Sequence, residues 1–519
     1  MEQKQNRPLL LERGADWLAS KGKESRLPFL SSLLLGLLAY AFASTNKLVN
    51  HDEVQSLFLK GGTVDSGRWG LGALDSIFPN ISMPWIYGIL SIMFIAAAIC
   101  IMVRIFRVEN KVLQVLLSGC VMVFPSLIGT FGYMFTSSSF ALSFLMAVIA
   151  VRILQWQPKW GFLPALGCMV FSLSIYQSYI AVAAGLLVLV LIWRLLHGEA
   201  VMPVIRSGIL YVVFLGLSLG IYYGATQVIL KLLGIGFNDY ASGNMGFSLL
   251  SIPGNIAESY RSFFRYLTEG DRGLVPTVLS RRMHWLFLGA AVMLLILWAL
   301  GQKKKELGRF ALLAALVAVL PLAVNCMYLF TVAESIHTLV LYGFVGVYVL
   351  AVIAADACIP LLSQVRWQDL LRQVLLDVVT VCLTVVVVVN IYIANAAYLN
   401  LHLRYENAYS FYTALAADIK MMPEFDEDTT IAIVGTWQEP GFYEEKFQWI
   451  EQITGVKGFL PDSYSRAKFM EYYIGLPIPS ASDEDIAAIT ASEAYAQMSA
   501  YPYYGSMQFF GDVLVVKLS

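Results

Sequence analysis

Eleven apolar runs of about twenty residues dominate the 519-residue chain. A helix of that length crosses the ~30 Å hydrocarbon core of a bilayer, and the runs lack the alternation that is typical of barrel strands. Only helices then satisfy the backbone hydrogen bonds of the chain within lipid. The predicted spans lie near 27–45, 83–103, 112–129, 136–156, 161–175, 178–196, 207–231, 284–300, 310–330, 338–360 and 374–398.

The composition agrees with this interpretation. Charged residues make up 14% of the chain, against about 25% in a typical soluble domain. The formal net charge of −1 and the absence of a basic domain argue against a nucleic-acid partner. All six cysteines lie inside apolar runs without metal-ligand spacing and are interpreted as small buried hydrophobic residues. We therefore predict an all-α polytopic membrane protein with about eleven transmembrane helices.

Lysine and arginine predict the orientation. They are concentrated in the N-terminal leader and in every second short loop, which the positive-inside rule places in the cytoplasm. An odd number of spans then puts the C-terminus outside. The predicted organisation is a cytoplasmic segment over 1–26, a transmembrane domain over 27–399 with long outer loops at 46–82 and 232–283, and an extracytoplasmic domain over 400–519.

The C-terminal part differs in composition, with 17 acidic and 7 basic residues between 401 and 519. Thr430–Gly435 and Asp512–Leu518 are apolar runs typical of buried strands. Helices are expected over Tyr405–Met421, Ser465–Ile474 and Asp483–Ser499. This pattern predicts a small α/β domain, whose acidity is explained by a solvated surface.

The sequence motifs of several common enzyme classes are absent from the chain. The chain has no Walker A loop, no GxGxxG between a strand and a helix, no HExxH and no GxSxG. The ionisable residues of the spans, such as Arg152 and Asp377, lie near span ends rather than at the midplane. The pattern of a proton- or ion-coupled transporter is therefore missing.

An acidic pair, Asp52-Glu53, follows the first span. A carboxylate at the membrane–water boundary can accept a proton from a hydroxyl nucleophile, so the pair is a candidate catalytic site. The alternative is a solvated acidic turn after a helix.

Arginines in both outer loops are candidates for binding an anionic group. Arg68 and Trp69 stand in SGRWG, where arginine suits a phosphate and tryptophan suits a sugar or lipid face. The second loop offers Arg261, Arg265, Arg272, Arg281 and Arg282. The alternatives are interfacial anchoring for the first group and lipid headgroup contacts for the second. His284 and His337, beside spans, are interpreted as structural.

The order of these motifs resembles a known family. The acidic pair is followed by SGRWG, YMFTSSSFALS, SIYQSYIAVA and NAAYLNLHLRYENA. Over residues 30–430 this order resembles the bacterial glucosyl transferase II (Gtr type II) family, within the polyprenyl-phosphate-sugar-dependent GT-C class of membrane glycosyltransferases. The resemblance implies that Asp52 is the general base, that Glu53 is its partner or an acceptor ligand, and that Arg68 contacts the donor phosphate. The chain departs from the pattern at 136–139, where serines replace an acidic residue of many relatives.

The resulting hypothesis is an inverting hexosyltransferase of the bacterial cytoplasmic membrane. It would transfer a hexose, with glucose favoured, from a polyprenyl-phosphate donor to a cell-envelope glycan or polymer at the outer face, with Arg68, Trp69, Arg261 and Arg265 holding the donor. No cofactor is expected beyond the lipid-linked sugar, and a role for a divalent metal is left open. Two other functions stay possible at this point: a lipid-linked glycan flippase, and a noncatalytic membrane scaffold with an outer binding domain.

Overall fold

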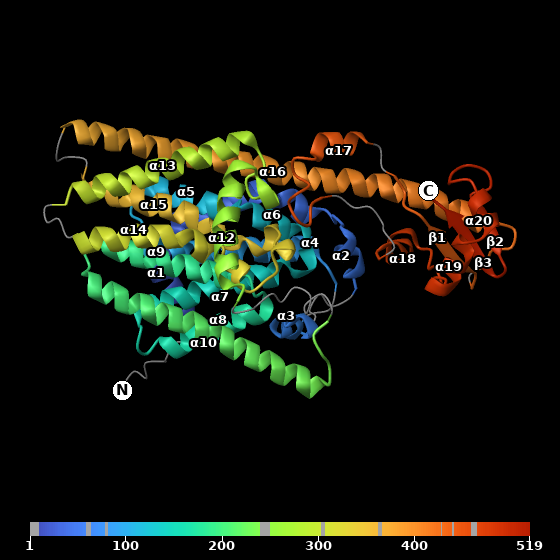
Figure 1. The fold of residues 1–519 in the computed structure, drawn as a ribbon, viewed down its shortest axis with the longest axis horizontal. Helices are drawn as coiled ribbons and strands as arrows, with labels where there is room; N and C mark the ends of the chain where they lie inside the picture. The colour runs from blue at the N-terminus through green and yellow to red at the C-terminus, as the bar shows by residue number, and fades with distance from the viewer. Residues whose placement is uncertain are drawn as a thin grey trace, which may run out of the picture.

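The computed structural model describes residues 10–58, 64–77, 81–238, 250–302, 307–361, 366–426, 428–438, 441–457 and 464–519. Parts of both predicted outer loops, at 59–63, 78–80 and 239–249, lie outside the described residues. A long helical bundle makes up most of the molecule, and a small sheet region projects from one end of it (Figure 1). We call this end of the bundle, which carries helix α2 (His51–Gln55), the α2 end.

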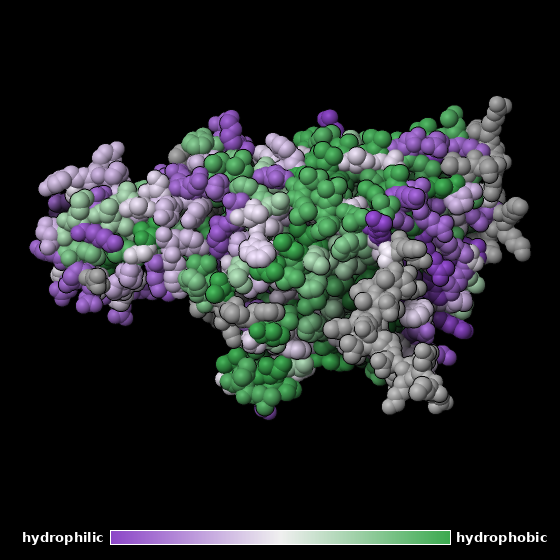
Figure 2. Space-filling view, turned by 180° about the vertical axis from the view of Figure 1, so that it is seen from behind, coloured by the Kyte–Doolittle hydropathy of each residue, from purple (hydrophilic) through white to green (hydrophobic). Residues whose placement is uncertain are grey.

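Nine helical segments of the described chain are long and apolar enough to cross a membrane. Each carries a run of apolar side chains, and much of this surface faces outward as a band between more polar ends (Figure 2). They are α1 (Leu10–Thr45), α4 (Pro84–Phe106), α7 (Met134–Trp156), α9 (Tyr179–Leu196), α10 (Val201–Leu233), α13 (Val278–Leu300), α14 (Leu307–Val324), Tyr342–Leu361 with α15 (Gly346–Cys358) between 3₁₀ turns η6 (Tyr342–Val345) and η7 (Ile359–Leu361), and α16 (Arg366–Lys420).

A tenth candidate span is bent. Together, helices α5 (Lys111–Met122) and α6 (Pro125–Gly132) are long and apolar enough to cross a membrane, but the chain bends by 42° between them. The bend lies at Phe124, whose extended backbone is the conformation favoured before a proline. The predicted polytopic helical fold is thus confirmed with nine to ten candidate spans. The remaining predicted segment, 161–175, is helix α8 (Phe162–Ile175), and its 14 residues extend only about 21 Å.

Short helices occupy the α2 end between the spans. These are η1 (Val64–Ser66), α3 (Trp69–Asp75), α12 (Ile252–Thr268), η2 (Asp271–Gly273), η3 (Cys326–Leu329), η4 (Ala333–Ser335) and η5 (Thr338–Val340). Helix α12 is amphipathic, with Phe263, Tyr266 and Leu267 buried on one face. The long outer loops predicted from the sequence therefore contain packed helices rather than simple connections.

The C-terminal region contains a three-stranded sheet in the order β1-β3-β2. Strand β1 (Thr430–Val434) is parallel to β3 (Val513–Lys517), and β2 (Met507–Phe510) is antiparallel to β3. The two predicted strands are confirmed, whereas β2 was not predicted. The surrounding helices are α17 (Phe442–Phe447), α18 (Arg466–Phe469), the π-helix η8 (Met470–Ile474), α19 (Asp483–Thr490) and α20 (Glu493–Gln497).

Helix α16 connects the bundle to the sheet region without a break (Figure 1). The predicted helix Tyr405–Met421 is the far end of this 55-residue helix. The two regions also exchange hydrophobic segments. Ile450, Ile453 and Val456 belong to the core of the bundle, while Val49 and Val54 belong to the core formed by α16, α18 and the sheet. The chain around α2 is therefore held from both sides.

Candidate active site

Helix α2 carries the acidic pair and begins at a capped residue. Asn50 has an extended backbone, and its Oδ1 accepts a hydrogen bond from the Glu53 amide at 2.9 Å. This contact satisfies a free N–H of the first turn, which is the usual role of asparagine at a helix N-cap. The cap fixes the rotation of α2 and hence the different directions in which Asp52 and Glu53 point.

Glu53 has no exposed surface. Its Oε1 accepts hydrogen bonds from Lys47 Nζ and Ser82 Oγ, and its Oε2 accepts one from the Phe135 amide at 3.3 Å. Both carboxylate oxygens are thus occupied by groups from three segments of the chain. This arrangement makes Glu53 an anchor that joins α2 to the starts of α4 and α7.

Asp52 lies in a different environment. Its side chain is 39% exposed, and its Oδ2 lies 3.7 Å from His51 Nε2. A carboxylate that reaches solvent can approach a substrate hydroxyl, whereas the enclosed Glu53 carboxylate cannot. Of the two predicted acids, Asp52 is therefore the one with the geometry of a base.

A turn from the C-terminal region lies directly beside α2. We call residues 452–456 the 452–456 turn. Asn50 Nδ2 donates to Gly132 O at 2.7 Å and to Gly455 O at 3.1 Å. On its other side the turn is bound by Thr338, whose Oγ1 donates to Gln452 O at 3.1 Å. The same hydroxyl also donates to Arg272 O, so the turn links the acidic pair to the loop that carries Arg272.

Arg68 precedes α3 and forms no ion pair with an acidic side chain of the described chain. Its guanidinium lies 5.3 Å from the centre of the Tyr176 ring, and its buried Nε has no hydrogen-bond partner. The preceding residue, Gly67, has φ +78°, and Tyr222 Oη donates to its carbonyl at 3.1 Å. A side chain at Gly67 would collide with that hydroxyl, so glycine permits the close approach that positions Arg68.

Arg272 and His337 approach the same place from two other segments. Arg272 Nη2 donates to Ala333 O at 3.2 Å, and its Nε lies 3.7 Å from Asp271 Oδ1. The Nδ1 of His337 is buried without a hydrogen-bond partner. Burial, together with the nearby charges of Arg68 and Arg272, lowers the pKa of His337 to about 4. We call Arg68, Arg272 and His337 the basic cluster.

The comparisons with known proteins decide the family. Residues 41–350 match the family model described as Glucosyl transferase GtrII. The chain belongs to the glucosyl transferase GtrII family. Neither the curated proteins nor the solved structures gave a match. Membership makes this protein a glycosyltransferase with a sugar donor and an acceptor, and the matched part of this GtrII member contains α2 and the whole basic cluster.

The sequence also suggested Trp69, Arg261 and Arg265 of this GtrII member as donor contacts. Each of them has a hydrogen-bond or ion-pair partner within the chain. Trp69 Nε1 donates to Thr226 Oγ1 at 3.2 Å and thereby attaches α3 to α10. Arg261 and Arg265 both pair with Glu258, at 2.5 and 2.6 Å. Arg265 also lies 3.7 Å from Asp271, the acid beside Arg272. Arg68 thus belongs to the basic cluster, and Arg265 lies at its edge through Asp271. Arg261 is instead paired with Glu258.

Sequence reasoning missed His337 as a site residue and did not select Arg272 from its run of arginines. The only signal was the proximity of both residues to predicted outer span ends, which many residues share. Within the ranges that the structure describes, no group of three His, Cys, Asp or Glu side chains has the arrangement of a metal site.

Proposed function

We propose that this GtrII member transfers glucose from a polyprenyl-phosphate donor to a glycan acceptor at the outer face of a bacterial cytoplasmic membrane. The observation that carries the proposal is the combination of a half-exposed carboxylate, Asp52, with a cluster of basic residues at the same end of the bundle, each of which has a buried nitrogen without a hydrogen-bond partner. The first suits a base, and the second suits a phosphate.

The reaction is a single displacement. Asp52 accepts the proton of an acceptor hydroxyl, the acceptor oxygen forms a bond to C1 of the glucose, and the bond from C1 to the phosphate oxygen breaks. The polyprenyl phosphate leaves as an anion without needing a proton. Attack from the face opposite the phosphate inverts the configuration at C1.

Arg68 is the proposed donor-phosphate contact, and Arg272 and His337 extend that contact. Each residue has a buried nitrogen without a hydrogen-bond partner. Buried donors without partners cost about 1–3 kcal/mol each, and phosphate oxygens would satisfy them. The phosphate gains negative charge as the bond to glucose breaks, so the two guanidinium groups stabilise the transition state more than the donor.

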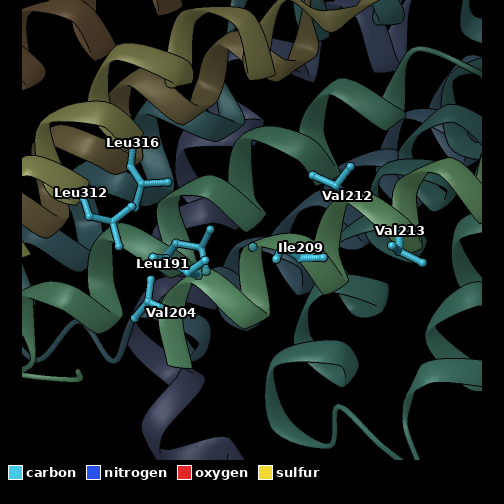
Figure 3. Close-up of a pocket in the computed structure, with 9 residues that line it drawn as sticks. Leu191, Val204, Ile209, Val212, Val213, Leu312 and Leu316 are labelled. Carbon is cyan, nitrogen blue, oxygen red and sulfur yellow. The ribbon is translucent and has the colours of Figure 1, made fainter. Parts of the chain in front are cut away.

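An apolar groove offers a path for the lipid tail. It is lined by side chains of α9, α10 and α14, among them Leu191, Val204, Ile209, Leu312 and Leu316 (Figure 3). Helix α10 also carries Tyr222 and Thr226, which hold Gly67 and Trp69 beside Arg68. From Thr226 to Val213, at the near end of the groove, α10 extends about 20 Å. A long isoprenoid chain spans that distance along one helix.

The proposed orientation of the protein in the membrane follows from the positive-inside rule. The basic loops place the N-terminus in the cytoplasm, which puts the α2 end outside. A lipid-linked sugar keeps its phosphate at the membrane boundary, where Arg68 precedes the short helix α3 rather than lying in a span.

The test is transfer of radiolabelled glucose by the purified protein in nanodiscs, from polyprenyl-phosphate glucose to envelope polysaccharide of the producing cell. We expect Asp52→Asn to lower kcat by about 10²–10⁴. The matched control is Asp512→Asn, an exposed carboxylate on the β2–β3 turn. Transfer by Asp52→Asn at the wild-type rate would rule out the assigned base. Transport of the intact donor without transfer would favour a flippase.

A further inference from the structure

The C-terminal region forms one wall of the chain segment that carries Asp52. Val54 of α2 packs in a core with Tyr412 of α16 and Phe469 of α18. The side chain of Gln55 donates to the carbonyl oxygen of Tyr464, the described residue that begins the approach to α18. Figure 1 shows α18 beside α2, between the bundle and the sheet. The seam between α2 and α18 therefore runs past the proposed base.

Aromatic rings from both sides meet along this seam. The His51 and Tyr464 rings have centroids 6.4 Å apart, and those of Phe58 and Tyr472 are 5.1 Å apart. His51 and Phe58 flank the short helix α2, while Tyr464 precedes α18 and Tyr472 lies in η8, so each ring pair joins the two sides of the seam.

Three of these rings remain substantially exposed, and that of Tyr472 is partly buried. The exposed fractions are 49% for the His51 side chain, 52% for Phe58 and 57% for Tyr464. Charged groups border the row: Lys468 Nζ lies 5.0 Å from the centre of the Tyr472 ring and pairs with Glu471 at 2.9 Å. The surface thus combines apolar ring faces with hydrogen-bonding groups at their edges.

We propose that His51, Phe58, Tyr464 and Tyr472 form the platform that binds the glycan acceptor. This inference rests on the proposed function, because it assigns the acceptor to the side of Asp52 that faces the C-terminal region. A pyranose ring presents an apolar C–H face that packs on an aromatic ring, and its hydroxyls reach neighbouring polar groups. A sugar on the His51 and Tyr464 rings lies beside the Asp52 carboxylate, which must accept the proton of its hydroxyl.

A lipid headgroup is the competing occupant, because tyrosines also gather at membrane interfaces. The charges favour the glycan. The charge of Glu471 is balanced by Lys468, so the carboxylate of Asp52 is the charge that remains at the His51 end of the row. That carboxylate repels anionic headgroups but accepts hydrogen bonds from sugar hydroxyls. Tyr464 and Tyr472 lie beyond residue 350, where the family match ends. The acceptor is therefore selected jointly by the family-matched part of the chain and by the C-terminal region.

The test separates acceptor binding from transfer. Full-length protein in nanodiscs is titrated with delipidated envelope polysaccharide of the producing cell, and binding is followed by saturation-transfer NMR. The variants are Tyr464→Ala, Phe58→Ala and the control Tyr504→Ala, whose ring is fully exposed on the turn before β2. We expect about tenfold weaker binding and an about tenfold higher acceptor KM for the first two, and wild-type values for the control. The KM for the donor stays unchanged.

Each outcome decides one claim. Equal polysaccharide binding by the wild type and Tyr464→Ala overturns the platform, whether or not transfer occurs. Ring-dependent binding without any glucose transfer supports the platform and contradicts the proposed function. A loss of contact with anionic vesicles in the Tyr464→Ala variant, with polysaccharide binding retained, assigns the rings to the membrane and also overturns the platform. Circular dichroism of each variant establishes that the fold is intact.

Discussion

Lys47 Nζ donates a hydrogen bond to Oε1 of Glu53 and forms an ion pair with a carboxylate that has no exposed surface. Lys47 itself is 25% exposed. The pair connects the chain just after α1 to α2. Ser82 Oγ bridges it, because it donates to Glu53 Oε1 and accepts from Lys47 Nζ at 2.8 Å. The two adjacent acids thus differ in environment: Glu53 holds α2 in place, whereas Asp52, the proposed base, reaches solvent.

We expect Glu53→Gln to destabilise the protein by about 2 kcal/mol, because it leaves the Lys47 ammonium without its counter-charge. Asp52→Asn is expected to change stability by less than about 0.5 kcal/mol, because the side chain is half-exposed. Denaturation of the purified variants in detergent measures both. The double variant Lys47→Met with Glu53→Gln should recover part of the loss. A larger loss for Asp52→Asn than for Glu53→Gln contradicts this distinction between the two acids.

Arg68 and Arg261 are expected to differ, although the sequence suggests both as donor contacts. Arg68 forms no ion pair with an acid among the described residues, whereas Arg261 pairs with Glu258. A hydrogen bond to a charged group contributes about 1.5–3 kcal/mol, so Arg68→Gln should raise the donor KM by about 10- to 100-fold. Arg261→Gln should raise it less than about threefold. Donor KM values for the two variants, measured at saturating acceptor, check the difference; equal values would remove Arg68 from its proposed role.

His337 gives the basic cluster a pH signature. Its pKa is lowered to about 4 by burial and by the charges of Arg68 and Arg272, against about 6.5 in an unfolded chain. Between pH 6.5 and 4 the unfolded chain therefore binds a proton that the folded protein does not, so stability falls as the pH falls through this window. Above pH 6.5 the contribution is fully present. The loss should reach about 2 kcal/mol, after allowance for the partial exposure of the ring.

The pKa of His337 can be measured directly. The chain has five histidines, so an NMR titration of ring-labelled protein gives few signals, and His337→Gln assigns the relevant one. We expect Arg68→Gln to raise the pKa of His337, because a positive charge is removed from its surroundings. Polyprenyl phosphate should raise it too, because the bound anion favours the imidazolium. A titration that neither change shifts would place the three residues too far apart to share a phosphate.

How much the sequence could predict depends on the range of the interaction. The spans follow from local hydropathy, and strands β1 and β3 follow from short apolar runs, so both were predictable. The different burial of Asp52 and Glu53 was not, because it depends on how the Asn50 cap rotates α2 against Phe135 and Ser82. The two acids are adjacent in the sequence, and no local pattern distinguishes them.

The basic cluster shows the same limit over longer distances. Its members come from three segments, and hydrogen bonds of Thr338 and the 452–456 turn bring two of these segments together. The turn itself lies in the polar C-terminal part, where composition predicts a separate domain rather than a contact with the bundle. Helix α16 likewise continues through residue 400, because its backbone has no proline or glycine there to end it.

Gly455 holds the 452–456 turn against the bundle. Its φ is +89°, and a Cβ atom there would lie 2.5 Å from Tyr133 Cε2 and 3.0 Å from Gly129 O. Gly455→Ala should therefore destabilise the protein by about 2–3 kcal/mol through the left-handed backbone and the collision together. It should also lower kcat, because the displaced turn no longer accepts the hydrogen bond from Asn50 that fixes α2.

Gly475→Ala is the matched control. Gly475 ends η8 with φ +74°, but no atom lies within 4 Å of its would-be Cβ atom. This variant has only the cost of the left-handed backbone, about 1 kcal/mol, and its kcat should match that of the wild type. Thermal denaturation and glucose transfer are compared at a temperature at which both variants are folded. If Gly455→Ala is less stable but transfers at the wild-type rate, the turn supports the fold without positioning Asp52.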